Sequence, residues 1–364
     1  MEMINETDKE ELIKQQYRII GSHSTVKICG WTKHSLQNVG VCYKQKFYGI
    51  KSHQCLQMST SLSCANRCVF CWRGKKAVVS KEWKWDVDEP EFIFKESLHA
   101  QKKLLEGYGG NDKVNKKLFE ESKTPKHVAL SLTGEPIIYP RINEFIDLCN
   151  KNHISTFVVT NGTYPEAIEN LNPVTQIYLS VDSPNKELAK LVGKPLFSDS
   201  WERFQRSVKA MSEKKSRTAI RITAIKNLNM VEPENYAKII NDANVDFVEV
   251  KAYMHVGESQ LRLKREQMPY HIEVLEFAKE ILKFLPNYEF VMEHIPSRVV
   301  LLVKKDFKIN GKWNTLIDFE KYNLLVNSGN EFSKFDFLKE TPIENLNIIG
   351  KNSWDGKYEE MEIK

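Results

Sequence analysis

The chain has 364 residues, of which 41% are hydrophobic and 28% are charged, and its formal net charge is +5 at pH 7. This composition is typical of a folded globular protein and excludes a disordered or fibrous chain. Residues 1–14 are polar and acidic, so we expect no secretory signal, and no apolar run reaches the roughly 18 residues of a membrane-spanning helix. We therefore expect a cytoplasmic protein, in which clustered cysteines bind metals or act in catalysis.

The first part of the chain predicts a helix followed by three short strands. Residues 7–21 carry apolar side chains at helical spacing, namely Leu12, Ile13, Tyr17 and Ile20. We interpret three short apolar segments as strands, at residues 24–31, 39–50 and 53–59.

A second helix is predicted over residues 88–107, before the repeating part of the chain. Asp88 is its possible N-cap, Pro90 lies in its first turn and Gly107 ends it. The polar, lysine-rich segment that follows, up to residue 126, predicts a loop or a weak helix.

From residue 127 onward, short apolar strands alternate with helices. The strands are expected at 127–134, 154–162, 175–182, 218–227 and 246–254, with helices in 140–152, from 165, and in 200–214, 233–243 and 270–285. This alternation is typical of parallel βαβ units, and residues 53–59 bring their number to six. Six units are too few for a closed eight-fold barrel, so we predict an α/β fold with a partial (βα)6 TIM-like barrel.

The barrel is expected to carry an extension at each end. We place an N-terminal extension at residues 1–50, the barrel at 51–285 and a C-terminal extension at 286–364. The last of these is predicted to contain further strands, at 288–296, 297–305 and 313–326.

Three cysteines with the spacing C-x3-C-x2-C follow the first predicted barrel strand, at Cys64, Cys68 and Cys71. A loop rarely buries three free thiols, and a structural zinc site needs a fourth ligand that no nearby cysteine or histidine pair supplies. A 4Fe–4S cluster bound by three thiolates keeps one iron open to a small molecule. The ends of barrel strands are also where catalytic groups lie, so this spacing favours a catalytic cluster.

This loop resembles the radical S-adenosylmethionine (radical SAM) superfamily, in which the open iron binds the amino and carboxylate groups of S-adenosylmethionine. In that family reductive cleavage gives methionine and a 5′-deoxyadenosyl radical. Phe70 matches the aromatic position near the adenine, and "SLTGEP" resembles the GGE motif, with Thr133 in place of the first glycine and Gly134 and Glu135 retained. Three polar residues that end later strands are candidate S-adenosylmethionine contacts or structural groups: Asn161, Ser180 and Asp182.

A second set of cysteines, Cys29, Cys42 and Cys55, is spaced thirteen residues apart, with one in each of the three predicted early strands. Neighbouring strands lie about 5 Å apart, so the three thiols can converge on a second open cluster. Three separately buried thiols remain the alternative. Cys149 lies among apolar residues in a predicted helix, and we interpret it as a core residue.

Lys44 follows Cys42 by two residues, so in a strand its amine points to the same face. A partly desolvated lysine near a metal has a lowered pKa and can form a Schiff base with a carbonyl compound. Lys46 and Lys51 share the neighbourhood, so the choice of lysine is open, and Lys44 can also be an ordinary exposed residue.

Together, the two triplets and longer stretches such as "CYKQKFYGIKSHQCLQM", "FVEVKAYMHVGES" and "TLIDFEKY" resemble the archaeal-type tRNA 4-demethylwyosine synthases. The resemblance runs from about residue 25 to 330. It implies a carbon–carbon lyase reaction that condenses pyruvate with N1-methylguanosine next to the anticodon of tRNA-Phe, forming a tricyclic base. Eukaryotic relatives carry an additional flavodoxin-like domain, which we do not recognise in this sequence, so an external donor such as a flavodoxin or ferredoxin is expected.

The resemblance also assigns roles to the cysteines and the lysine. Cys64, Cys68 and Cys71 would bind the radical SAM cluster, and Cys29, Cys42 and Cys55 would bind the second cluster, where pyruvate docks. Lys44 would be the Schiff-base candidate.

Three basic segments are candidate tRNA contacts, at residues 81–85, 111–126 and 262–266, although each can equally be a solvated face. Two other functions stay open. A radical enzyme acting on a protein or small molecule, such as a glycyl-radical activase, would be indifferent to tRNA and pyruvate. An iron–sulfur electron carrier would need four cysteines for each cluster.

Overall fold

A computed structural model describes residues 2–74 and 77–346, so residues 347–364 of the expected C-terminal extension lie outside the described residues. Its main sheet has ten strands in the order β1-β2-β3-β4-β5-β6-β7-β8-β10-β9. The strands are β1 (Arg18–Ile20), β2 (Ser24–Val26), β3 (Cys55–Ser59), β4 (His127–Leu130), β5 (Ser155–Thr160), β6 (Gln176–Ser180), β7 (Arg217–Ala224), β8 (Phe247–Ala252), β9 (Tyr288–His294) and β10 (Val299–Lys304).

The six central strands, β3 to β8, are parallel, and the outer strands on both sides are antiparallel. This confirms the predicted partial (βα)6 barrel, which is open where β1 and β9 form its two edges. Within the described residues, no helix is long and apolar enough to cross a membrane.

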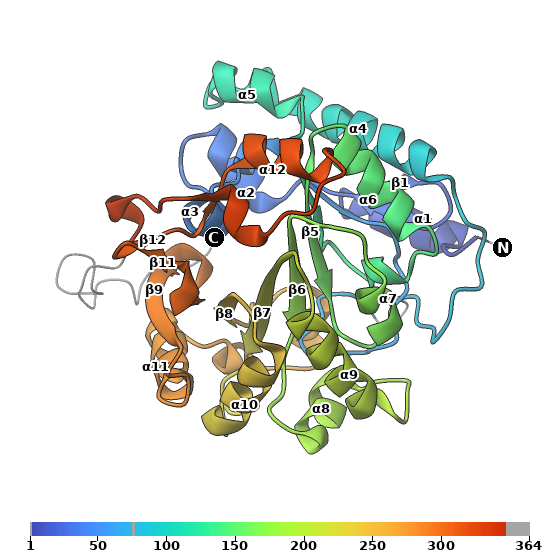
Figure 1. The fold of residues 1–364 in the computed structure, drawn as a ribbon. Coiled ribbons are helices and arrows are strands. Elements are labelled where there is room, and N and C mark those ends of the chain that lie inside the picture. The colour runs from blue at the N-terminus through green and yellow to red at the C-terminus, as the bar shows by residue number, and fades with distance from the viewer. Residues whose placement is uncertain (1, 75–76, 347–364) are drawn as a thin grey trace.

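Helices cover the outer face of the curved sheet, as Figure 1 shows. They are α4 (Pro90–Leu105), α6 (Ile142–Lys151), α7 (Pro165–Glu169), α8 (Lys186–Gly193), α9 (Ser200–Ser212), α10 (Pro233–Ala243) and α11 (His271–Leu282). The core between the two layers contains Leu56, Val158 and Val248 from the strands, each fully buried. Because side chains alternate along a strand, the residues next to these point into the barrel.

The amino-terminal end of the barrel is filled by a second apolar cluster. It joins Phe47 and Tyr48 of α3 (Tyr43–Tyr48) to Tyr178 and Phe247 of the barrel and to Trp313 of the C-terminal segment. This segment contains β11 (Lys308–Ile309), β12 (Lys312–Trp313), β13 (Leu316–Ile317), α12 (Phe319–Val326) and β14 (Leu338–Lys339). Figure 1 shows it beside α3, so the C-terminal segment closes the amino-terminal end of the barrel.

Polar contacts also hold α3 against the C-terminal segment. The Thr315 hydroxyl donates a hydrogen bond to the Phe47 carbonyl at 2.8 Å, and the Asn345 side-chain amide donates to the Lys46 carbonyl at 3.0 Å.

Two of the three early strand predictions were wrong in most of their length. Residues 24–31 form only the short β2 before α2 (Gly30–Leu36), and residues 39–50 contain helix α3 instead of a strand. Tyr43 and Phe47 lie four residues apart, which matches one helical turn and also two strand periods, so their apolar pattern does not separate the two structures. Helix α3 ends at Gly49, which has a left-handed backbone conformation at φ +81°. The apolar pattern alone does not indicate this helix end.

Two helix boundaries and one predicted strand also differ from the structure. The first helix, α1 (Glu6–Lys14), is followed by β1, so the expected helix over 7–21 is wrong after residue 14. Helix α4 has Glu89 as its N-cap, and Asp88 instead accepts hydrogen bonds from Ser22. The predicted strand over 313–326 is mostly helix α12. The lysine-rich segment contains the short helix α5 (Lys116–Ser122), in agreement with the prediction of a loop or a weak helix.

Candidate active site

The first cysteine triplet lies on the loop that leaves β3. Cys64, Cys68 and Cys71 are free thiols close enough to interact electrostatically with one another, and Arg73 faces all three. Burial raises the pKa of Cys64 to about 11, so without a metal this thiol stays protonated at neutral pH. The nearby guanidinium opposes that effect and favours the thiolate form that binds iron.

The segment after β8 fixes the far end of this loop. Arg262 donates hydrogen bonds to the carbonyl oxygens of Val69 at 3.1 Å and Arg73 at 3.3 Å, and also to that of Cys71. The Arg262 guanidinium therefore helps to hold the cysteine loop, and the tRNA contact expected of residues 262–266 stays a prediction.

A second contact between the same two segments depends on a glycine. The Glu258 amide donates to the Trp72 carbonyl at 3.1 Å. Gly257 has φ +58°, and a Cβ atom there would lie 2.5 Å from the same carbonyl oxygen. The close approach of the two backbones therefore requires glycine.

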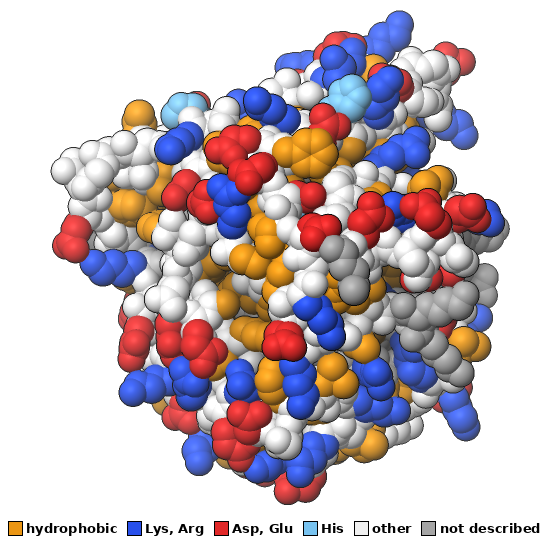
Figure 2. Space-filling model, turned by 90° about the vertical axis from the view of Figure 1, so that its right-hand side faces the viewer, with side chains coloured by type: hydrophobic (Ala, Val, Ile, Leu, Met, Phe, Trp, Pro, Cys, Tyr) orange, Lys and Arg blue, Asp and Glu red, His pale blue; other side chains and the backbone are white. Residues whose placement is uncertain are grey.

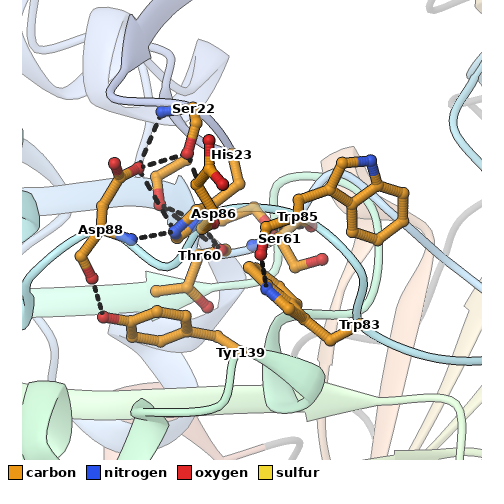
Figure 3. Close-up of polar contacts among 11 residues, drawn as sticks. Ser22, His23, Thr60, Ser61, Trp83, Trp85, Asp86, Asp88 and Tyr139 are labelled. Atoms are coloured by element: carbon orange, nitrogen blue, oxygen red, sulfur yellow. Dashed lines mark hydrogen bonds and ion pairs between the residues drawn. The ribbon is translucent and has the colours of Figure 1, made fainter. Parts of the chain in front are cut away.

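A buried polar network fixes the near end of the loop (Figure 3). The His23 Nδ1–H donates to the Thr60 carbonyl at 2.7 Å, since a carbonyl can only accept. The Asp88 carboxylate accepts from the Ser22 amide at 2.7 Å, and the Tyr139 hydroxyl donates to the Asp88 carbonyl at 2.6 Å. Burial lowers the pKa of His23, which favours the neutral ring, and the network fixes the end of β3.

Gly134 and Glu135 pack directly against the start of the cysteine loop. Gly134 has φ +68°, and a Cβ atom there would overlap the carbonyl oxygen of Ser61, so only glycine fits. The Glu135 amide donates to the Ser63 carbonyl at 2.8 Å, and its Oε2 accepts from the Asn161 amide at 3.0 Å. Its Oε1 is buried with no hydrogen-bond partner in the described residues, and burial raises the pKa of this carboxyl to about 7. An unpartnered buried carboxylate oxygen fits a cationic group such as the amino group of S-adenosylmethionine.

A cleft beside the loop is lined by the other four predicted S-adenosylmethionine contacts, Phe70, Asn161, Ser180 and Asp182, together with Cys68. The Asn161 side-chain amide donates to the Cys64 sulfur at 3.3 Å, and the Asp182 carboxylate accepts from the Thr223 amide at 2.9 Å.

The same cleft is closed by two aromatic residues of α9 that sequence reasoning missed. Trp201 and Phe204 have ring centroids 5.4 Å apart and line the cleft opposite the cysteine loop. The sequence signal for these two residues was an aromatic pair three positions apart on the predicted helix over 200–214.

The second triplet is brought together by three different elements. Cys29 precedes α2, Cys42 precedes α3 and Cys55 begins β3. All three are free thiols, and Cys55 interacts electrostatically with both of the others. The three cysteines therefore converge as expected, but not from three adjacent strands.

The described residues do not form a ready site for a single metal ion at this triplet. In the part of the chain that the structure describes, no three His, Cys, Asp or Glu side chains could hold one metal ion. A 4Fe–4S cubane places each thiolate on a different iron, so its cysteines lie farther apart than the ligands of one zinc.

Lys44 lies in the first turn of α3, so the argument from a shared strand face was wrong, although its amine does lie near Cys42 and Cys55. The side chain is 8% exposed, and its Nζ lies 4.4 Å from the centre of the Tyr178 ring inside the barrel. Burial lowers the pKa of this amine. Lys46 donates to the Glu293 carbonyl at 2.7 Å and Lys51 is exposed, so Lys44 is the lysine of the three that faces the barrel interior.

Seven inward-pointing side chains between the two triplets are each partly exposed. They are Gln57, Ser131, Val159, Ser180, Arg221, Thr223 and Lys251. Cys149, by contrast, is fully buried in α6, which confirms its interpretation as a core residue.

The candidate tRNA-contact segments differ in how exposed their side chains are. Lys113, Lys116 and Lys117 are exposed, whereas Trp83 and Trp85 pack against apolar clusters. On the face shown in Figure 2, acidic and basic side chains are interspersed with apolar ones and form no patch of one sign.

Comparisons with known proteins agree with this geometry. The family model "Radical SAM superfamily" matches residues 58–240, half of the chain, and "Wyosine base formation" matches residues 242–304. The S-adenosyl-L-methionine-dependent tRNA 4-demethylwyosine synthase TYW1 of Xenopus laevis is 44% identical over 348 residues, covering 94% of this chain and 47% of that protein. The chain thus spans about half the length of this curated relative.

Two solved structures are similar along nearly their whole length. A structure of TYW1 with a lysine–pyruvate adduct bound is 38% identical, with a TM-score of 0.76, and the match covers 85% of this chain and 99% of that one. A crystal structure of archaeal TYW1 is 34% identical, with a TM-score of 0.69 and the same two coverages.

Proposed function

This chain belongs to the radical SAM superfamily and, within it, to the TYW1 family, and we propose that it is an S-adenosyl-L-methionine-dependent tRNA 4-demethylwyosine synthase. Membership of the superfamily brings S-adenosylmethionine and a 4Fe–4S cluster as cofactors. One observation carries the proposal: a second cysteine triplet and a buried lysine face into the same barrel as the radical SAM loop.

At the first site, Cys64, Cys68 and Cys71 would hold the radical SAM cluster. Together the cluster and S-adenosylmethionine supply, when bound, the radical chemistry that removes a hydrogen atom from a methyl group. The free oxygen of Glu135 would accept from the amino group of S-adenosylmethionine, and Gly134 keeps that carboxylate close to the loop. The cleft beside the loop supplies Phe70 for the adenine and three polar contacts: Asn161, Ser180 and Asp182.

At the second site, Cys29, Cys42 and Cys55 would hold a second 4Fe–4S cluster beside the pyruvate site. Lys44 would form a Schiff base there with pyruvate. The amine nitrogen would bond to the carbonyl carbon, and the carbonyl oxygen would leave as water. The related TYW1 structure with a lysine–pyruvate adduct supports this role, and the burial of Lys44 favours its neutral, nucleophilic form.

The substrate and reaction class follow from the same resemblance. The base would be N1-methylguanosine next to the anticodon of tRNA-Phe, and carbons 2 and 3 of pyruvate would complete its third ring while the carboxyl carbon leaves. The enzyme would thus be a carbon–carbon lyase of the archaeal type. It would work in the cytoplasm with an external electron donor such as a flavodoxin or ferredoxin. Exposed lysines such as Lys113 and Lys117 are the proposed phosphate contacts, and a steep loss of tRNA affinity with added salt would test them.

The test is an anaerobic reaction of the reconstituted protein with tRNA-Phe containing N1-methylguanosine, pyruvate, S-adenosylmethionine and a reductant. Nucleoside analysis should show 4-demethylwyosine that depends on pyruvate and is labelled by carbons 2 and 3 of pyruvate. Formation of 5′-deoxyadenosine without any change in the base, and independent of tRNA and pyruvate, would contradict the proposal. That result would favour a radical enzyme for a protein or small molecule.

A further inference from the structure

The inner wall of the barrel beside the second triplet carries more cations than carboxylates. Arg221 and Glu249 are direct neighbours on β7 and β8, and Lys251 follows two residues later on β8. Lys44 enters the same space from α3, and both Lys44 and Lys251 interact electrostatically with Cys42 and Glu249. Three basic side chains therefore surround a single carboxylate.

That carboxylate is already hydrogen-bonded to other groups. The Tyr48 hydroxyl donates to one Glu249 oxygen at 2.7 Å, and the Tyr43 hydroxyl donates to the other at 3.0 Å. Glu249 is fully buried, and both tyrosines belong to the apolar cluster at the amino-terminal end of the barrel. Its oxygens thus point toward α3 and are occupied there.

Arg221 and Lys251 have N–H donors that are not paired with an acidic side chain in the described residues. Across residues 2–74 and 77–346, neither forms an ion pair within 4.0 Å. The Arg221 guanidinium shares a hydrogen bond with Tyr43 and lies 5.9 Å from the centre of the Tyr178 ring, and the Lys251 amine donates once, to the Ser297 carbonyl at 3.1 Å. Both side chains are only partly exposed, and the carboxylate beside them, Glu249, already accepts hydrogen bonds from two tyrosine hydroxyls, so the two cations can stabilise a second anion.

We propose that Arg221 and Lys251 bind the carboxylate of pyruvate and thereby turn its carbonyl carbon toward the Lys44 amine. A guanidinium can hold both carboxylate oxygens in one plane, and the ammonium adds a second charge from the neighbouring part of β8. This inference rests on the proposed function, because it concerns how the same site recognises its substrate. Reaction at Lys44 would then require the free carboxylate of pyruvate as well as its ketone.

The experiment measures adduct formation on Lys44 instead of turnover. The reconstituted protein is incubated anaerobically with increasing pyruvate and reduced with borohydride, and the fraction of modified Lys44 is read by peptide mass spectrometry. Arg221→Gln and Lys251→Gln should each raise the half-saturating pyruvate concentration by about 10-fold or more, the loss expected for a charge-assisted hydrogen bond. Arg206→Gln is the matched control, because Arg206 lies on the outer face of α9 and pairs with Glu166.

A neutral analogue makes the test independent of protein folding. In the parent protein, methyl pyruvate should give at least about 10-fold less adduct than pyruvate at equal concentration, and Arg221→Gln should reduce this preference. Equal labelling of the parent by the two compounds would overturn the inference. Unchanged half-saturation in both folded variants would overturn it as well. A parent protein that forms no adduct and no tricyclic base would instead contradict the proposed function.

Discussion

The two cysteine triplets differ in how the chain brings their thiols together. The first lies within residues 64–71 of one loop, and hydrogen bonds from neighbouring segments hold the backbone of that loop in place. The second is spread over residues 29–55, and its members come from the starts of two short helices and one strand. A local site depends on a few backbone contacts, whereas an assembled site depends on the packing of whole elements.

The energetic support of the two sites differs accordingly. Arg262 reaches three carbonyl oxygens of the first loop, and backbone hydrogen bonds from neighbouring segments add to these, so that site is held mainly by hydrogen bonds. The helix that carries Lys44 and follows Cys42 is held by a large apolar cluster, which includes Phe47, Trp313 and Phe337. Burying each such aromatic side chain contributes about 1.5–3 kcal/mol or more, so the second site is stabilised mainly by packing.

The strongest test of this comparison removes the second triplet as a whole. We propose two clusters, so the parent protein should contain about eight irons per chain after reconstitution, and the Cys29→Ala, Cys42→Ala, Cys55→Ala triple variant about four. The variant should still cleave S-adenosylmethionine, because the first loop shares none of the altered residues, but it should form no tricyclic base. Iron and 5′-deoxyadenosine analyses measure both effects. About four irons in the fully reconstituted parent would eliminate the second cluster.

The next test separates the lysine from the cluster at the second site. Lys44→Ala should keep both clusters and still form 5′-deoxyadenosine, but its formation of the tricyclic base should fall by at least about 100-fold, as expected when a positioned catalytic group is lost. Labelled pyruvate and borohydride should mark the parent and not this variant. Lys46→Ala is the matched control, since the Lys46 amine already donates to the Glu293 carbonyl. Normal product from Lys44→Ala would refute the assignment.

A third test weakens only the first site. Arg262→Gln removes charged hydrogen bonds to the cysteine loop, each contributing about 1.5–3 kcal/mol, so the loop should bind its cluster poorly. We expect 5′-deoxyadenosine formation to fall about 10-fold or more, together with the electron paramagnetic resonance signal of the first cluster, while pyruvate still labels Lys44. Arg262→Lys should restore part of the signal, and Arg265→Gln, on an exposed residue, should behave like the parent. Equal losses at both sites would show that the two regions are not independent.

The smallest effect concerns the acid sensitivity of the region around the second triplet. His294 packs on Trp31 at 5.3 Å between ring centroids, and burial lowers its pKa to about 4, with further lowering by Lys46, His271 and Lys251. An unfolded histidine has a pKa of about 6.5, so the unfolded chain binds more protons between these values. The neutral ring thus contributes stability that is complete above about pH 6.5 and is lost as the pH falls toward 4.

At about 1.4 kcal/mol per pKa unit, this loss is at most about 3.5 kcal/mol. Urea unfolding of the metal-free protein at pH 7.5 and pH 5 should show it, and His294→Gln should reduce the difference between the two pH values. His153→Gln, on an exposed histidine, is the control. An identical pH dependence in His294→Gln would exclude this histidine as the cause.

The barrel and the first loop could be predicted because their signals are local. Six strands alternate with helices along the chain, and the spacing of Cys64, Cys68 and Cys71 is visible within one line of sequence. The helix over 43–48 could not be recognised in this way. It is only six residues long, its N-cap is a cysteine, and its apolar side chains are buried by residues almost 300 positions away. For such a segment tertiary packing decides the structure, and local propensity does not.

The same limit applies to individual contacts at the candidate site. Gly134 was selected as part of a ligand-binding motif, but the structural reason for glycine there is the carbonyl of Ser61, more than 70 residues earlier in the chain. Arg262 was interpreted as a surface charge because its sequence neighbours are basic, and only the fold shows that it reaches Val69 and Arg73. Contacts of this kind join segments far apart in sequence, so no local pattern records them.

The closure of the barrel by its C-terminal segment has a consequence for the order in which the protein matures during synthesis. The radical SAM loop and α3 emerge from the ribosome well before Thr315 and Asn345, which hold α3. Since domains form as their residues become available, α3 lacks these contacts until the C-terminal segment has been translated. Iron delivered earlier would therefore meet the second triplet before α3 is secured, and the proposed second cluster is best inserted once residues 315–345 have been made.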